Sequence, residues 1–184
     1  MNREKIRRYR MVVGVDLTDY SEIVIERALD QAARQLAPEL HFIHAAENRK
    51  ANFADLNERL SAAVYPALQV FNQYGTDWRA RLHVRRGKPD QQISILAADV
   101  NADLIVMGQF GLHRKGLPGR VLAHAPCATL IVQMPKQHDS SQCCACSAVR
   151  EDSDGVRWFC DDHIVPDVVS PLSVWTNGRG ALVQ

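Results

Sequence analysis

The stretch ADLIVMG at residues 102–108 decides the fold class of this chain. It holds an uninterrupted apolar run at residues 104–107 and ends on a glycine. A run of this length without polar alternation is typical of a parallel strand that is covered on both faces. Residues 11–15 read MVVGV and have the same character, and Asp16 follows them directly. The two stretches predict a parallel sheet that lies between layers of helices.

Around these two stretches the sequence alternates helical and strand periodicity. The Asp-x-x-Glu pattern at residues 19–22 is a capping box and predicts the start of the first helix. Apolar side chains then recur at helical spacing up to Pro38, and again up to Gly75. Residues 79–85 alternate basic and apolar side chains, which predicts an edge strand. Five strands and four helices over residues 11–135 indicate a doubly wound α/β domain with a five-stranded parallel sheet and helices on both faces.

Two chemical features fall at the carboxyl ends of the predicted strands. Asp16 follows the first strand, and Gly108-Gln-Phe-Gly111 follows the fourth. Ligands of doubly wound folds bind at this edge, where backbone amides and a carboxylate can meet. A glycine after a strand is as often needed for steric reasons alone, so both interpretations stay open.

Three segments resemble the universal stress protein family: VVGVDLTDYSEIVIERALDQA at residues 12–32, ADLIVMGQFG at residues 102–111 and VLAHAPCATLIVQ at residues 121–133. The resemblance covers about residues 10–135. It implies a sheet with strand order 3-2-1-4-5 and a homodimer through the fifth strand, residues Ala128–Val132. The fifth strand is apolar, which agrees with a dimer through this edge. The strand at the opposite edge, residues 79–85, carries arginines, and charge on an edge strand deters pairing with another chain.

The resemblance also bears on ATP, because some family members bind it and others do not. The ATP-binding branch is marked by an Asp after the first strand and by Gly-x2-Gly-x9-Gly-Ser/Thr after the fourth. Here Gly119 follows after seven residues instead of nine, and Arg120 replaces Ser or Thr. The shortened stretch lacks the amides that would hold phosphates, which argues against ATP. The candidate nucleotide-site residues are Val15, Asp16, Gly108 and Gly111.

Four of the five cysteines lie in CCACSAVREDSDGVRWFCDDH, residues 143–163. The pairs Cys143-x2-Cys146 and Cys160-x2-His163 are separated by 13 residues, the spacing of a closed structural Cys₃His zinc site. We therefore expect Zn²⁺ bound by Cys143, Cys146, Cys160 and His163. The alternative is a redox dithiol, in which Cys143 or Cys144 pairs with Cys146 or Cys160.

A β-hairpin is expected inside the cysteine segment. Residues 148–151 and 156–159 are short enough to pair across Asp-Ser-Asp-Gly at residues 152–155, and the pairing would bring the ligand pairs together. So small a unit cannot build a core, and bound zinc would supply about 10 kcal/mol of folding free energy.

These features divide the chain into five parts. We expect a basic arm, the α/β domain, a polar linker, a zinc-knuckle module and a tail, at residues 1–10, 11–135, 136–142, 143–165 and 166–184. The net charge of +1 conceals two opposite segments. Residues 1–10 hold five basic side chains and one glutamate, whereas residues 138–184 hold seven acidic side chains and three arginines. An acidic module repels phosphates, so a protein partner suits it better than nucleic acid.

The sequence favours a regulatory binding protein of the universal stress type, acting through dimerisation and protein partners. One alternative is an ATP-binding switch with weak or no hydrolysis, and a second is an RNA- or ribosome-associated stress factor that uses the basic arm. No catalytic residue is assigned, because the seven histidines form no Ser-His-Asp or His-Glu-x-x-His arrangement. No apolar run approaches the roughly 20 residues of a membrane span, and we expect a cytoplasmic protein.

Overall fold

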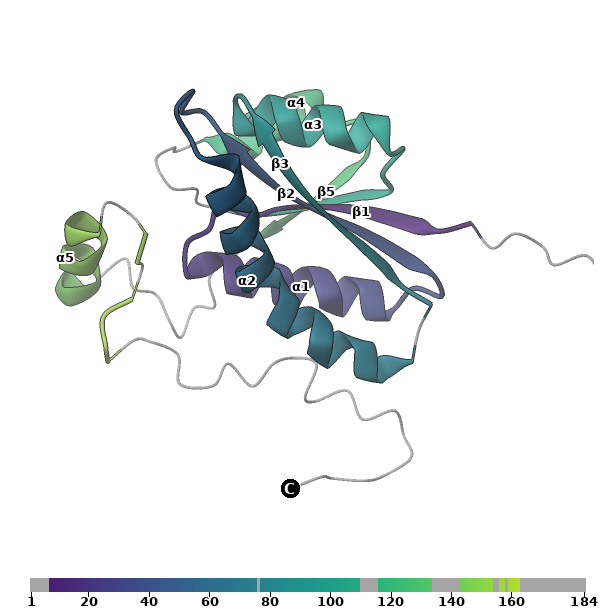
Figure 1. Ribbon diagram of the computed structural model, residues 1–184, viewed down its shortest axis with the longest axis horizontal. Helices are drawn as coiled ribbons and strands as arrows, with labels where there is room; N and C mark the ends of the chain where they lie inside the picture. The colour runs from purple at the N-terminus through teal and green to yellow at the C-terminus, as the bar shows by residue number, and fades with distance from the viewer. Residues whose placement is uncertain are drawn as a thin grey trace, which may run out of the picture.

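The computed structural model describes residues 7–75, 77–109, 116–133, 143–153, 156–157 and 159–162. Five parallel strands form one sheet in the order β3-β2-β1-β4-β5 (Figure 1), which confirms the predicted topology. The strands are β1 (Tyr9–Gly14), β2 (Pro38–Ala46), β3 (Arg79–Arg86), β4 (Leu104–Gly108) and β5 (Ala128–Val132).

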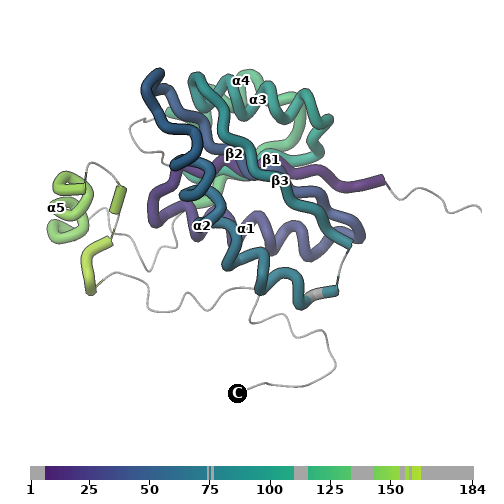
Figure 2. Tube along the Cα trace, in the orientation of Figure 1, coloured from purple at the N-terminus to yellow at the C-terminus, as the bar shows by residue number. Residues whose placement is uncertain are grey.

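Helices cover both faces of the sheet. α1 and α2 lie together on one face, and α3 and α4 lie together on the other (Figures 1 and 2). A further helix, α5, stands apart from both layers. The helices are α1 (Tyr20–Ala33), α2 (Phe53–Phe71), α3 (Pro89–Asp99), α4 (Leu117–His124) and α5 (Cys144–Asp152), and the short 3₁₀ turn η1 (Asn72–Tyr74) follows α2. Within the described ranges no helix is both long and apolar enough to span a bilayer.

Alternate residues of each central strand enter two separate cores. Val13 of β1 belongs to the core beneath α1 and α2, whereas Val12 belongs to the core beneath α3 and α4. β4 behaves in the same way, since Val106 faces the first core and Ile105 the second. All four side chains are fully buried. This two-sided burial is the physical reason for the uninterrupted apolar runs.

The predicted start of the first helix is confirmed, since α1 begins at Tyr20, but the capping box that predicted it does not form. Asp19 stands at the N-cap position of α1, but its backbone is already helical (φ −59°, ψ −26°) and its side chain makes no capping hydrogen bond. A side-chain cap needs an extended N-cap residue. Asp16 organises the start of this helix instead, by accepting a hydrogen bond from the Ser21 hydroxyl at 2.6 Å.

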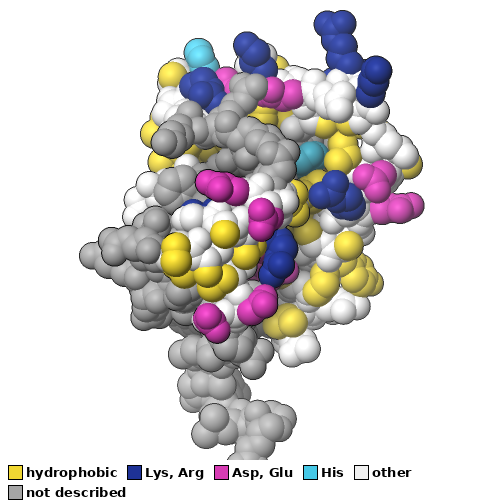
Figure 3. All heavy atoms as spheres, turned by 90° about the vertical axis from the view of Figure 1, so that its left-hand side faces the viewer, with side chains coloured by type: hydrophobic (Ala, Val, Ile, Leu, Met, Phe, Trp, Pro, Cys, Tyr) yellow, Lys and Arg dark blue, Asp and Glu magenta, His cyan; other side chains and the backbone are white. Residues whose placement is uncertain are grey.

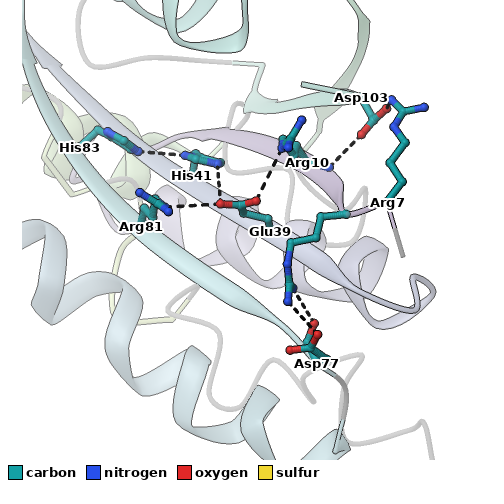
Figure 4. Close-up of polar contacts among 9 residues, drawn as sticks. Arg7, Arg10, Glu39, His41, Asp77, Arg81, His83 and Asp103 are labelled. Atoms are coloured by element: carbon teal, nitrogen blue, oxygen red, sulfur yellow. Dashed lines mark hydrogen bonds and ion pairs between the residues drawn. The ribbon is translucent and has the colours of Figure 1, made fainter. Parts of the chain in front are cut away.

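β3 forms one edge of the sheet, as its alternating pattern predicts. Beside it, on β2, the carboxylate of Glu39 is only 10% exposed and has two arginines and a histidine as neighbours (Figure 4). Its oxygens lie 3.6 Å from Arg10 Nε, 3.4 Å from Arg81 Nε and 3.7 Å from His41 Nε2. His41 Nδ1 is in turn 3.0 Å from His83 Nε2 on β3. This polar chain links β1, β2 and β3.

The described end of the basic arm is bound to the domain. Arg7 pairs with Asp103, and Arg8 Nη2 lies 2.7 Å from an oxygen of Asp77 (Figure 4). Arg10 lies within β1, where its backbone N–H donates to Asp103 at 2.9 Å. These ion pairs reduce the positive charge that residues 7–10 offer to a nucleic acid.

The buried His41 makes stability depend on pH. Burial, followed by the neighbouring His83, lowers the pKa of His41 from 6.5 to about 4. Between these values the unfolded chain takes up a proton that the folded chain refuses, so the free energy of unfolding falls as the pH drops from 6.5 to 4. We expect a loss on the order of 3 kcal/mol from this residue. Urea unfolding across this range measures it.

The matched variants for this test are His41→Gln and His124→Gln, the latter on the exposed face of α4. His41→Gln should flatten the pH dependence, and His124→Gln should leave it unchanged. Equal slopes in the wild type and His41→Gln would contradict the assignment.

Candidate functional site

A cavity of about 610 Å³ lies at the carboxyl ends of β1, β2 and β4. Its volume falls in the range of small-molecule binding sites. Three of the four candidate nucleotide-site residues, Val15, Asp16 and Gly108, line it, while Gly111 is outside the described residues. The other walls are mostly apolar and include Val24, Ile43, Leu56, Ile93, Met107 and Leu117. Polar side chains at the cavity come from Asp16, His44, Glu47, Asn48 and Arg59.

The turn between β1 and α1 is held by the carboxylate of Asp16. Its Oδ1 accepts hydrogen bonds from the Thr18 amide at 3.2 Å, the Thr18 hydroxyl at 2.8 Å and the Ser21 hydroxyl at 2.6 Å. Oδ2 receives no hydrogen bond from the residues that the structure describes. Leu17 adopts a left-handed backbone with φ 63°, which costs about 1 kcal/mol for a residue with a side chain. The turn is therefore a strained element, held in place by one oxygen of Asp16.

His44 joins the site from the end of β2. Its Nδ1 lies 2.9 Å from the Val15 carbonyl oxygen, and a carbonyl only accepts, so Nδ1 carries the proton. Burial lowers the pKa of His44, although the Val15 carbonyl and Asp16 oppose the shift. The imidazole is therefore neutral at pH 7 and keeps Nε2 as an acceptor. Val15 also donates its own N–H to Ile43 O at 2.9 Å, so its main contribution is an apolar wall.

Sequence reasoning missed His44 and Arg59 as site residues. His44 sits on a strand next to β1 and close to its carboxyl end, which was the available indication. Arg59 lies on α2, whose sequence shows nothing that distinguishes an arginine over the cavity from one in solvent. Gly14 has a separate role, because a Cβ there would lie 3.1 Å from Ile93 Cδ1. The glycine lets α3 approach the sheet below the cavity.

In the stretch that the family motif reserves for phosphate, the structure describes residues 116–120. Gly119 lies in the first turn of α4, and Pro118 before it has no N–H to offer. Arg120, which stands in place of Ser or Thr, points its Nε to within 3.6 Å of Asp90 Oδ1, and Asp90 is only 6% exposed. The arginine therefore bridges α4 and α3 and is not among the residues that line the cavity.

A second candidate site lies in the C-terminal segment. The sulfur atoms of Cys143, Cys146 and Cys160 all lie within 4.8 Å of one another. Cys146 Sγ and Cys160 Sγ are 3.6 Å apart, close to the roughly 3.8 Å that two thiolates span on a tetrahedral zinc. The Cys160 amide also donates to Cys146 Sγ at 3.3 Å, which favours negative charge on that sulfur. The donor set thus fits a thiophilic metal such as zinc.

The structure describes Cys144 but not His163, the fourth predicted ligand. His163 lies outside the described residues, so its role stays a prediction. Cys144 is exposed and is not part of the cluster, in agreement with its lack of a ligand position in the sequence. Backbone and side-chain hydrogen bonds from Cys146 lower the pKa of Cys143 to about 7, whereas burial raises that of Cys146 to about 11.

The predicted hairpin at the cysteines is wrong. Residues 148–151 lie inside α5, a helix that runs through Cys144–Asp152 and brings Cys143, at its N-cap position, and Cys146 to one end. Ala145, Ala148, Arg150 and Glu151 have high helix propensity, which outweighs the turn pattern that follows them. A Cys-x2-Cys pair fits this geometry, because residues three apart share one face of a helix. The start of α5 therefore brings the thiols of Cys143 and Cys146 together without a β-hairpin.

Comparisons with known proteins agree with this fold. A universal stress protein from Archaeoglobus fulgidus, solved in complex with dAMP, is 22% identical and superposes with a TM-score of 0.52 over 67% of this chain and 96% of that chain. A universal stress protein family protein from Arabidopsis thaliana, solved with AMP bound, is 16% identical, with a TM-score of 0.54 over 73% and 97% of the two chains. These likenesses concern the fold. Among curated proteins none matches. The profile of the universal stress protein family matches residues 8–133, and the chain belongs to that family.

Proposed function

We propose that this chain is a regulatory binding protein that takes an adenine nucleotide in the cavity at the carboxyl ends of β1, β2 and β4. The observation that carries the proposal is Asp16, which lines the cavity, uses Oδ1 to hold its own turn and keeps Oδ2 for a ligand. The family relatives solved with dAMP and AMP support a nucleotide as the ligand class.

The chemistry of the walls favours a purine ribonucleotide. Apolar side chains on both sides suit the faces of a flat base. Asp16 Oδ2 and His44 Nε2 are both acceptors, so they match the donors of the ligand, namely an amino group on the base and the ribose hydroxyls. Arg59 adds a cation at the cavity for a phosphate.

A monophosphate fits the described residues better than a triphosphate. The shortened stretch before α4, Pro118 and the Arg120–Asp90 pair remove donors that would hold further phosphates. We infer that ATP binds with an affinity similar to that of AMP, and that ATP hydrolysis is slow or absent. The site then works as a sensor of a nucleotide rather than as an enzyme.

The cysteine cluster supports a second proposal, a structural Zn²⁺ site. Cys143, Cys146 and Cys160 supply three thiolates, and His163 completes a Cys₃His set without an open position for catalysis. When bound, the metal cross-links α5 to the segment that carries Cys160. A redox dithiol is the competing proposal, and the 3.6 Å between Cys146 Sγ and Cys160 Sγ is compatible with both.

The partner proposals follow from the β5 edge of the sheet and from the charge of the two terminal segments. β5 is an edge strand with half-buried apolar residues, which suits a homodimer through Ala128–Val132. On the face that carries α5, acidic side chains surround an apolar patch (Figure 3). Among the described residues of this segment, the exposed acidic ones are Glu151, Asp152, Asp161 and Asp162. This charge favours a basic or neutral protein partner over RNA, and the paired arginines at residues 7–10 weaken the RNA alternative further.

Removing the Asp16 charge tests the nucleotide proposal. Calorimetric titration with AMP, and with ATP in millimolar Mg²⁺, should show saturable binding of similar affinity to the wild type. Asp16→Asn should weaken AMP binding about 10- to 100-fold, because a hydrogen bond to a charged group is worth about 1.5–3 kcal/mol. The control Asp77→Asn, at an exposed ion pair before β3, should bind like the wild type. No saturable binding of either nucleotide would overturn the proposal.

Metal content tests the zinc proposal. Protein purified under reducing conditions without chelator should hold about one zinc per chain. Cys160→Ser should lose it, whereas Cys144→Ser, which alters a thiol outside the cluster, should keep it. A metal-free wild type with a disulfide that reductant opens would instead establish the dithiol.

Light scattering at tens of micromolar tests the dimer. The wild type should have twice the mass of the chain, and Ala128→Lys should be a monomer because it places a cation on the exposed start of β5. Leu36→Lys, at an 85% exposed leucine between α1 and β2, is the control that should stay dimeric. A monomeric wild type would refute the interface.

A further inference from the structure

Among its described residues, the cysteine segment reaches the main core through the aromatic side chain of Phe159. Phe159 is only 5% exposed and belongs to the core cluster beneath α1 and α2, together with Tyr20 and Val132. Cys160, the next residue, is 7% exposed and touches Cys146 of α5. The thiol cluster and the domain core are therefore connected through adjacent residues.

The same segment touches the turn that holds the cavity. The Asp19 amide donates to the Val156 carbonyl oxygen at 3.4 Å. Asp19 lies between Asp16, which lines the cavity, and Tyr20, whose hydroxyl donates to Val132 O at 2.7 Å. The turn that supplies Asp16 thus has the cysteine segment as a neighbour on its outer side.

Docking on this side supports the cavity and does not fill it. None of the described residues of the cysteine segment lines the cavity. The turn itself carries backbone strain at Leu17, so contacts that hold it lower the cost of keeping Asp16 in place. A docked segment should therefore favour ligand binding.

We propose that a metal ion at Cys143, Cys146 and Cys160 docks Val156 and Phe159 onto the start of α1 and the β1–α1 turn, and thereby strengthens nucleotide binding in the cavity. The inference rests on both proposed functions. Without the metal, the described residues between α5 and Cys160 are held by hydrogen bonds and by the packing of Phe159, and the entropy of a freed loop favours undocking. The metal removes that freedom by fixing Cys160 to Cys146.

Thermodynamic linkage makes the coupling between zinc and AMP binding reciprocal. If zinc raises the affinity for AMP by some factor, AMP must raise the affinity for zinc by the same factor. A coupling of about fivefold or more is expected, at the lower end of what such contacts produce. The chain would then report metal or thiol status through its nucleotide occupancy.

Amide hydrogen exchange and AMP titration on the full chain test the inference together. With zinc bound, the Asp19 amide should exchange at least about fivefold more slowly than after chelation in reductant, and AMP should bind at least about fivefold more tightly. The amides of Val12 and Val13 in β1 are the internal reference and should not change. Phe159→Ala should keep zinc but behave like the metal-free protein in both readouts.

Two further variants serve as controls for Phe159→Ala. Arg157→Ala alters an exposed side chain of the same loop and should retain the coupling, and Phe159→Leu should restore most of it. Zinc and AMP that both bind, with equal AMP affinity and equal Asp19 exchange in the two states, overturn the coupling alone. Absence of zinc binding overturns the metal proposal and the coupling. If AMP never binds while Asp19 exchange still responds to zinc, the nucleotide proposal fails and only the docking stands.

Discussion

The covering of β1 and β4 on both faces constrains everything else in the molecule. Because the side chains of residues 11–13 and 104–107 all enter one of two apolar cores, polar chemistry at these strands is confined to their ends. Asp16 comes two residues after the end of β1, and Gly108 is the last residue of β4. The cavity between them is thus a consequence of how the sheet is buried. Its ligand chemistry depends on the few residues that the strand ends expose.

The cysteine segment meets the opposite constraint, since it has almost no apolar interior of its own. Cys146, Phe159 and Cys160 are its buried apolar residues among those described. Phe159 packs into the core of the α/β domain, and the three thiols lie within 4.8 Å of one another. A metal would add the cross-link that a unit of this size lacks. The proposed coupling to the cavity rests on the position of this segment beside the β1–α1 turn.

The fold could be predicted because its determinants are local and periodic. Uninterrupted apolar runs gave the central strands, alternating arginines gave the β3 edge, and Asp16 and the three clustered cysteines were visible by position and spacing. The strand order itself came from the family resemblance. Gly111 and His163 lie outside the described residues and stay predictions.

What sequence reasoning missed depends on geometry that spacing does not encode. The Asp-x-x-Glu pattern at residues 19–22 does not reveal that Asp16 already holds this turn. The cysteine spacing suits a hairpin and a helix equally, and the propensities of Ala145, Ala148 and Glu151 decide for the helix. His44 reads as a packed strand residue until β2 is placed beside β1.

We propose that the cavity beside Asp16 binds a nucleotide. An NMR titration of the zinc-loaded protein with AMP tests this residue by residue, because each backbone amide reports separately. Saturable shifts should concentrate at residues 14–20, at His44 and at Gly108, and Asp16→Asn should move the titration to higher AMP concentration. Absent shifts, or shifts confined to residues elsewhere in the chain, would rule out nucleotide binding in this cavity.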